Sequence, residues 1–210
     1  MARSKSSGKW LAEHFTDEFV KRARKEGYRS RAVYKLREID ERDHILRPGM
    51  VVADLGAAPG AWSQYVRERV GKAGRVIALD ILAMEPLSGV DVLQGDFTEE
   101  TTLQALLDAL NGQPVDLVIS DMSPNISGIE SADQARSMYL AELAMEFSVR
   151  VLKPGGLFLV KVFQGQGFSE LYKEMQRRFE QVVTRKPKAS RPRSPELYLL
   201  GKGFRASRDV

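Results

Sequence analysis

Polar side chains that can bind or activate a ligand stand at the ends of several apolar runs in the chain. Aspartates end two of the runs, at Asp80 and Asp121, Asp96 follows a third, and Lys161 lies near the end of a fourth. Carboxylates accept hydrogen bonds from hydroxyl and amino groups, and a lysine can move a proton or stabilise a developing negative charge. A fifth run is followed by the loop D-L-G-A-A-P-G (54–60), whose small residues let a ligand approach the backbone closely.

The apolar runs alternate with amphipathic stretches, which is the pattern of strands separated by helices. Strands are predicted at 51–55, 75–80, 90–93, 115–121, 156–163, 182–186 and 196–201, and helices at 61–70, 99–110, 131–152 and 168–179. This order predicts an α/β fold with a seven-stranded, mostly parallel sheet covered on both faces. The last two strands are joined only by the proline-rich segment 187–195, so we expect them to be antiparallel.

Two short helices are predicted before the first strand. One begins after Thr16, a good N-cap residue, and ends near Gly27. The other begins after Ser30 and carries Ala32, Leu36 and Ile39 on one face.

Ligands of such a sheet bind beyond the carboxyl ends of its strands. We therefore expect one crevice to be bordered by Gly56, Asp80, Asp96, Asp121 and Lys161. Asp80 is suited to ribose hydroxyls, and Asp96 can accept a hydrogen bond from an adenine amino group. A nicotinamide cofactor is disfavoured, because Ala58 stands where a dinucleotide-binding loop has its second glycine.

Composition excludes several classes of protein. The 210 residues suit one domain and include no cysteine, so a pyrimidine C5-methyltransferase with a cysteine nucleophile is excluded. The chain has no apolar run long enough to span a membrane and no secretory signal, which leads us to expect a cytoplasmic protein. His14 and His44 are far apart in polar surroundings, and no metal site is expected.

Both ends of the chain are basic. Residues 1–37 carry a net charge of +7, residues 38–184 carry −9, and residues 185–208 carry +7. Clustered positive charge favours a nucleic-acid partner, although solvated basic tails are also common. The candidate RNA contacts are Arg29, Arg31, Lys188, Arg191 and Arg193. Residues 1–9 are expected to form a disordered tail, 10–204 a single domain and 205–210 a short second tail.

Seven segments together resemble the FtsJ-type family of bacterial 2′-O-ribose methyltransferases that modify large-subunit ribosomal RNA. They are R-S-R-A-V-Y-K-L (29–36), D-L-G-A-A-P-G-A-W-S-Q (54–64), L-Q-G-D-F (93–97), S-D-M-S-P-N-I-S-G (120–128), K-P-G-G (153–156), V-K-V-F-Q-G (160–165) and S-R-P-R-S-P-E-L-Y (190–198). The resemblance runs from about residue 10 to residue 201. Two positions depart from the family pattern, Ala61 in place of glycine and Ser123 in place of alanine.

The resemblance implies a Rossmann-like methyltransferase of class I that uses S-adenosylmethionine. Its catalytic tetrad would be Lys35, Asp121, Lys161 and Glu196. Its cofactor contacts would include Gly60, Trp62, Asp80, Asp96 and Asp121. It further implies a role in ribosome biogenesis. The protein is expected to be a monomer, and methyl transfer from a sulfonium needs no metal because the cofactor already carries the leaving group. The implied substrate is a uridine of large-subunit ribosomal RNA, in the assembled or assembling subunit.

Alternatives remain open at this point for single residues and for the function. Lys161 can act as a base only when neutral, whereas a charged Lys161 can stabilise the developing alkoxide; we expect the base role. By position alone, Lys35 can be a surface lysine and Trp62 a core residue. A methyltransferase acting on a base amino group would place an aromatic residue after Pro124, where Asn125 stands. A non-catalytic RNA-binding module would explain the basic ends but needs neither the loop nor the tetrad.

Overall fold

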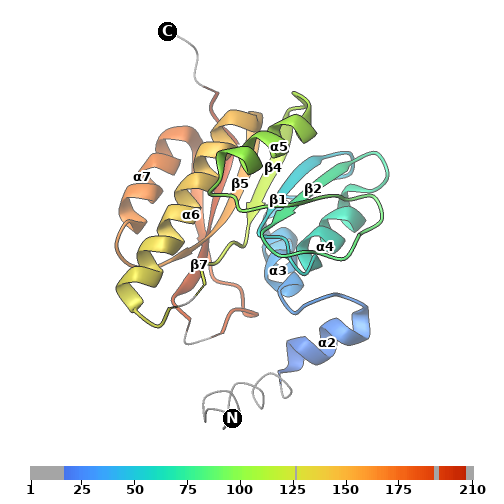
Figure 1. Cartoon of the computed structure of the whole chain (residues 1–210), viewed down its shortest axis with the longest axis horizontal. Coiled ribbons are helices and arrows are strands. Elements are labelled where there is room, and N and C mark those ends of the chain that lie inside the picture. Colours follow the sequence, from blue (N-terminus) through green and yellow to red (C-terminus); the bar gives the residue numbers. More distant parts are fainter. Residues whose placement is uncertain (1–16, 126, 192–193, 207–210) are drawn as a thin grey trace.

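The computed structural model describes residues 17–125, 127–191 and 194–206, and it contains one seven-stranded sheet (Figure 1). The strands are β1 (Val51–Leu55), β2 (Arg75–Asp80), β3 (Asp91–Gln94), β4 (Val115–Ser120), β5 (Leu152–Phe163), β6 (Phe179–Arg185) and β7 (Glu196–Phe204). Their order is β3-β2-β1-β4-β5-β7-β6, and only β7 runs antiparallel to its neighbours. The expected fold class and the antiparallel last pair are thereby confirmed.

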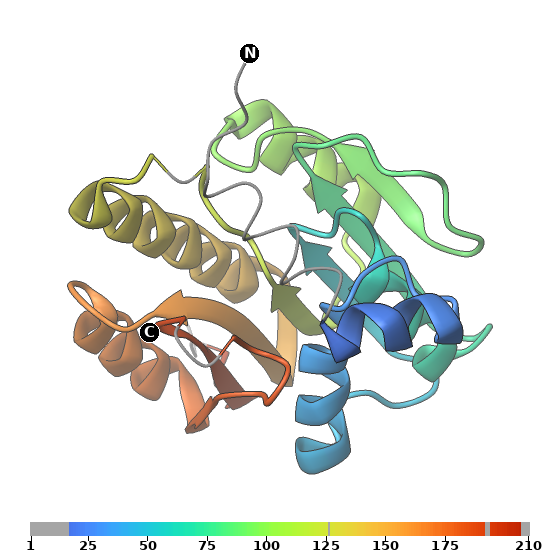
Figure 2. The same ribbon diagram turned by 90° about the horizontal axis from the view of Figure 1, so that it is seen from below.

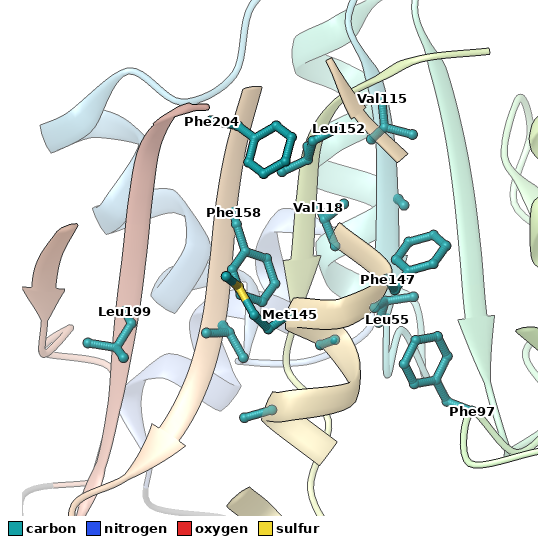
Figure 3. Packing of buried hydrophobic residues seen from close by; sticks show 14 of the residues in the cluster. Leu55, Phe97, Val115, Val118, Met145, Phe147, Leu152, Phe158, Leu199 and Phe204 are labelled. Atoms are coloured by element: carbon teal, nitrogen blue, oxygen red, sulfur yellow. The ribbon is translucent and has the colours of Figure 1, made fainter. Parts of the chain in front are cut away.

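Helices cover both faces of the sheet and divide the core into two clusters. The helices are α2 (Glu18–Glu26), α3 (Val33–Asp43), α4 (Ala61–Val70), α5 (Glu100–Leu110), α6 (Glu130–Val151) and α7 (Phe168–Arg178). Alternate strand residues pack on opposite faces, as Val118 of β4 lies with α6 and Ile119 with α3 and α4. Figure 3 shows Met145 and Phe147 of α6 packed over Val118 and Phe158.

The two helices before β1 begin later than the sequence suggested. The N-cap of α2 is Asp17, whose carboxylate accepts a hydrogen bond from the Phe19 amide at 2.9 Å, so the expectation of a Thr16 cap was wrong. Helix α3 begins at Val33 because Ser30 forms a turn, its hydroxyl accepting a bond from the Ala32 amide. Leu36 and Ile39 are buried as expected. The predictions for residues 1–9 and 207–210 lie outside the described residues.

Three strands, β5, β6 and β7, are longer than predicted, whereas β4 ends one residue earlier than predicted, at Ser120. β5 begins at Leu152, because Leu152 already pairs with Val115 of β4, and the turn 153–156 is absorbed into the strand. β6 likewise begins at Phe179. Figures 1 and 2 show α2 and α6 on opposite sides of the end of β4.

Candidate active site

Strand register brings the predicted catalytic residues together. Lys161 of β5 is the cross-strand partner of Tyr198 in β7, and Glu196 lies two residues before Tyr198 on the same face. Ser120, the last residue of β4, pairs with Val160, so Asp121 follows at the level of Lys161. Lys35 reaches the same point from α3, which is held against this face by Leu36 and other buried residues.

The tetrad forms two ion pairs. Lys161 Nζ donates to the Asp121 carbonyl at 2.6 Å and lies 3.2 Å from Asp121 Oδ1. Lys35 Nζ lies 2.7 Å from Glu196 Oε1, and Ser190 Oγ donates to the same oxygen at 2.8 Å. The side chain of Lys161 is only 5% exposed. A lysine buried so deeply needs such a partner, and the pair holds its ammonium nitrogen in one position.

Tyr198 links the two ion pairs and was not singled out from the sequence. Its hydroxyl donates to Asp121 Oδ1 at 2.8 Å and lies 3.5 Å from Glu196 Oε1. Lys35 Nζ lies 5.9 Å from the centre of its ring. Residues two apart in a strand lie on the same face, so the predicted strand already placed Tyr198 beside Glu196 and could have pointed to Tyr198. The four residues of the predicted tetrad, together with Tyr198, are called the catalytic group below, after the role predicted for the tetrad.

The charges of the catalytic group are mutually stabilised. Burial favours the neutral acid at Asp121, but Lys161, Lys35 and the Tyr198 hydroxyl outweigh it and hold the pKa of Asp121 below its usual value. Burial and the nearby carboxylates of Asp121 and Glu196 raise the pKa of Tyr198 well above its usual value. The phenol therefore keeps its proton and remains a donor to the ionised Asp121.

A cavity of about 550 Å³ opens beside Asp121 at the carboxyl ends of the strands. It is lined by Gly56, Ala58, Leu79–Leu82, Gly95–Thr98 and Asp121–Asn125, and on the α6 side by Arg136, Tyr139 and Leu140. We call it the cofactor cavity. The sequence predicted Gly56, Asp80, Asp96, Asp121 and Lys161 at one crevice. The first four line the cavity, whereas Lys161 is not part of its lining and instead contacts Asp121 at the edge.

Two of the three acids that line the cavity, Asp80 and Asp96, are anchored by backbone amides. Asp80 accepts bonds from the Ala58 and Leu82 amides, both at 2.8 Å. Asp96 Oδ1 accepts from the amide of Thr98 at 2.9 Å and from its hydroxyl at 2.7 Å, and these bonds lower the pKa of Asp96. The Asp96 Oδ2 atom has no partner among the described residues, so it is free to accept a ligand amino group.

Apolar side chains form the walls of the cavity. Of the five large apolar side chains that are exposed in the described part of the chain, Ile81, Leu82 and Tyr139 line it, with exposures of 57%, 65% and 50%. A Cβ added to Gly56 would lie 2.8 Å from the Met122 backbone, so only glycine fits there. Two carboxylates beside apolar walls fit the ribose, amino group and ring of an adenosine moiety, as S-adenosylmethionine would present.

Two predicted cofactor contacts lie away from this lining. Trp62 is 3% exposed, its Nε1 donates to the Ala32 carbonyl at 2.8 Å, and its ring lies 5.8 Å from that of Tyr198. Gly60 lies beneath the side chain of Arg29. Trp62 therefore packs between α4 and Tyr198 of the catalytic group. A direct cofactor contact by Trp62 or Gly60 stays a prediction.

Asp54 is buried below the catalytic group and the cavity. It is 0% exposed, its Oδ2 accepts from Ser63 Oγ at 2.6 Å, and its Oδ1 has no partner. Burial, with smaller contributions from the charges of Asp121 and Asp80, raises the pKa of Asp54 to about 7. The site thus holds a carboxyl that carries its proton below neutral pH.

The predicted RNA contacts differ in their surroundings. Lys188 and Arg191 are exposed. Arg31 is half-buried and bonded to the Asp17 carboxylate and the Ala189 carbonyl. Arg29 is also half-buried and bonded to carbonyl groups, and Arg193 lies outside the described residues.

The arrangement can hold a hydroxyl group between a lysine and a cavity suited to a nucleoside-containing cofactor. Among the described residues, no three His, Asp or Glu side chains gather where they could hold a metal ion. None of the helices in that part of the chain has the length and apolar character needed to cross a membrane.

Comparison with known proteins adds three similarities. Residues 28–204 match the model of the FtsJ-like methyltransferase family. Proteins called ribosomal RNA large subunit methyltransferase E from Methylobacillus flagellatus and Azoarcus sp. are each 62% identical, covering 96% and 98% of this chain and 97% and 100% of their own length. A crystal structure from Plasmodium falciparum, of a protein assigned as a ribosomal RNA methyltransferase, has a TM-score of 0.76 at 29% identity and covers 84% of this chain and 98% of its own.

Proposed function

The chain belongs to the FtsJ-like methyltransferase family, and on that ground we propose that it methylates a ribose 2′-hydroxyl of large-subunit ribosomal RNA using S-adenosylmethionine. The observation that carries the proposal is the position of Lys161, paired with Asp121 at the edge of the cofactor cavity. A ribose hydroxyl is a poor nucleophile until its proton begins to leave, so a lysine at this edge supplies what the reaction needs.

The cofactor would be held by residues of the cavity. Asp80 would bind the ribose hydroxyls, Asp96 Oδ2 the adenine amino group, and the apolar walls the ring. Gly56 would let the backbone approach closely. When bound, S-adenosylmethionine supplies a methyl group on a positively charged sulfur. The sulfur is a good leaving group without help from a metal ion.

The catalytic group would position and activate the hydroxyl. Once its ammonium form has released a proton to solvent, Lys161 would accept the 2′-hydroxyl proton on Nζ, while the ribose oxygen takes the methyl group and the methyl–sulfur bond breaks to leave a neutral thioether. Asp121 fixes Nζ through two contacts, and Lys35 balances the charge of Glu196. Holding the oxygen in line with the methyl group lowers the barrier further, because orientation replaces a chance encounter.

RNA would approach over the basic ends of the chain. Lys188 and Arg191 are exposed on the segment that leads to Glu196, so phosphates bound there would place the target ribose near the catalytic group. Arg193 lies outside the described residues and stays a predicted RNA contact. The proposed target is a uridine presented by the assembled or assembling subunit. The proposed enzyme is a monomer that acts in the cytoplasm.

The test is methyl transfer by the purified chain with labelled S-adenosylmethionine. The acceptors are naked large-subunit RNA and large-subunit particles from cells that lack the enzyme. We expect one modified nucleotide, with the methyl on the ribose by mass spectrometry and resistance to alkaline cleavage at that nucleotide. A methyl group on a base would overturn the proposal, and RNA binding without transfer would favour a binding module.

A further inference from the structure

Arg29 lies over the loop that follows β1. Its Nη1 donates to the Pro59 carbonyl at 3.0 Å and to the Glu85 carbonyl at 2.7 Å, and its Nη2 donates to the Pro86 carbonyl at 2.9 Å. One guanidinium thus joins two loops, the one that follows β1 and the one that follows β2. Between these loops stands Asp80, the predicted ribose ligand.

The backbone around Arg29 is anchored to α4, the helix that follows the loop 54–60, which is called the cofactor loop below. The Arg29 amide donates to Gln64 Oε1 at 2.8 Å, and Gln64 Nε2 donates to the Gly27 carbonyl at 3.2 Å. The Trp62 bond to the Ala32 carbonyl fixes the other end of the segment. Residues 28–32, called the strap below, therefore cannot shift without disturbing α4.

Contact between the guanidinium and the cofactor loop is direct. A Cβ added to Gly60 would lie 2.9 Å from Arg29 Nη1, so the loop packs against the guanidinium itself. The Ala58 amide, on the same loop, donates to Asp80 at 2.8 Å. A displacement of the loop would consequently also move the carboxylate that faces the cavity.

We propose that Arg29 is a positioning residue for the cofactor, which fixes the loops on both sides of Asp80, and that it is not an RNA phosphate contact. This rests on the proposed function, because it assumes that the cavity binds S-adenosylmethionine. A planar guanidinium presents donors from two nitrogens in a wide, fixed fork that reaches carbonyls of both loops, whereas a lysine ammonium offers its donors from a single nitrogen and does not reproduce that geometry. Arg31, on the same strap, is bonded instead to Asp17 and Ala189 and does not contact the cofactor loop.

The test compares Arg29→Lys with Arg31→Lys, since both keep the charge and the aliphatic stem. Calorimetry should give an S-adenosylmethionine Kd about tenfold weaker for Arg29→Lys, the order of effect expected when charge-assisted hydrogen bonds are lost. The Arg31→Lys variant should stay within about twofold of the unmodified chain, by the same reasoning. In steady-state kinetics, KM for the cofactor should rise in Arg29→Lys while kcat at saturating cofactor changes little.

A second variant, Arg29→Met, tests the RNA alternative. If Arg29 contacted a phosphate, removing its charge would reduce the slope of log K for RNA against log salt by roughly 0.7–0.9. We expect an unchanged slope together with weakened cofactor binding. Equal cofactor Kd in Arg29→Lys and the unmodified chain would overturn the inference, as would a reduced slope in Arg29→Met. If the unmodified chain itself bound no S-adenosylmethionine, the proposed function would fail instead.

Discussion

Side chains of the catalytic group are bonded to one another, whereas Asp80, Asp96 and the apolar walls of the cofactor cavity are bonded to backbone amides or exposed to solvent. Lys161 and Tyr198 both contact Asp121, and Lys35 contacts Glu196. In the cavity, Asp80 and Asp96 use backbone amides, and Ile81, Leu82 and Tyr139 are left exposed. Proton transfer requires groups already held in place, while a cofactor that must enter and leave requires open, uncovered surface.

The largest effect should come from removing Lys161. Lys161→Ala should lower kcat roughly 10²–10⁴-fold, the range for losing a general acid or base. The cofactor Kd should stay nearly unchanged, because Lys161 does not line the cavity. Single-turnover methyl transfer and calorimetry on the same protein measure the two quantities.

Arginine at position 161 identifies the role of the lysine. Its guanidinium keeps the positive charge but cannot accept a proton near neutral pH. Lys161→Arg should therefore be nearly as inactive as Lys161→Ala. Substantial activity in Lys161→Arg would reassign the residue to electrostatic stabilisation of the alkoxide.

A substitution in the cofactor cavity should weaken cofactor binding and affect catalysis less. Asp80→Ala should weaken S-adenosylmethionine binding by about 30-fold or more, because it removes a charged acceptor and frees the amides of Ala58 and Leu82. The catalytic group should remain intact, so kcat at saturating cofactor should fall much less. Asp91→Ala is the matched control, since Asp91 is an exposed aspartate of β3 that pairs with Arg75. Equal Kd values in the two variants would remove Asp80 from the cofactor site.

Tyr198→Phe makes a finer change within the catalytic group. It removes one hydroxyl that donates to Asp121, and kcat should fall about tenfold as Asp121 and Lys161 lose their fixed geometry. Cofactor Kd should change little. The control is Tyr65→Phe, because the Tyr65 hydroxyl also donates to a buried aspartate, Asp40 at 2.8 Å, but lies outside the site. Tyr65→Phe should lower stability and leave kcat unchanged; if it lowers kcat as much, Tyr198 has only a structural role.

Strand-end residues were predictable from sequence because the carboxyl ends of parallel strands share one edge of a sheet. That rule alone brought Asp80, Asp96 and Asp121 to one place. Lys35 and Glu196 came only from the resemblance, because their meeting depends on how α3 packs and on the register of β7. These are tertiary facts that local pattern does not encode.

The net charge of the chain ends predicted the RNA contacts less reliably than the strand ends predicted the cavity. Arg29 and Arg31 belong to a basic end, and net charge cannot distinguish a free guanidinium from one bonded to backbone carbonyls. Lys188 and Arg191, in the other basic end, are exposed as a phosphate contact requires. The difference arises from the strap, whose partners are distant in sequence and invisible to composition.

The smallest predicted effect concerns Asp54, whose pKa is raised in part by the charges of Asp121 and Asp80. The pH dependence of stability tests whether these two charges act on it. With a pKa of about 7 when folded and an ordinary value when unfolded, the folded state binds more protons between about pH 4 and 7. Stability from this group is therefore fully present below its unfolded pKa and is lost as pH rises through about 7. Near pH 5–6 the loss should be on the order of 1 kcal/mol per pH unit.

Asp54→Asn removes the titration while keeping an oxygen that can accept the Ser63 hydroxyl. Urea unfolding at several pH values from 5 to 8 should show a flatter pH dependence for the variant, and at pH 8 the variant should be at least as stable as the unmodified chain. Adding Asp80→Ala to the unmodified chain should lower the folded pKa of Asp54 slightly, because one of the two repelling carboxylates is gone. Parallel stability curves for the unmodified chain and Asp54→Asn would mean that Asp54 is ionised throughout this range, and that the negative charges of the catalytic group and the cavity do not act on it together.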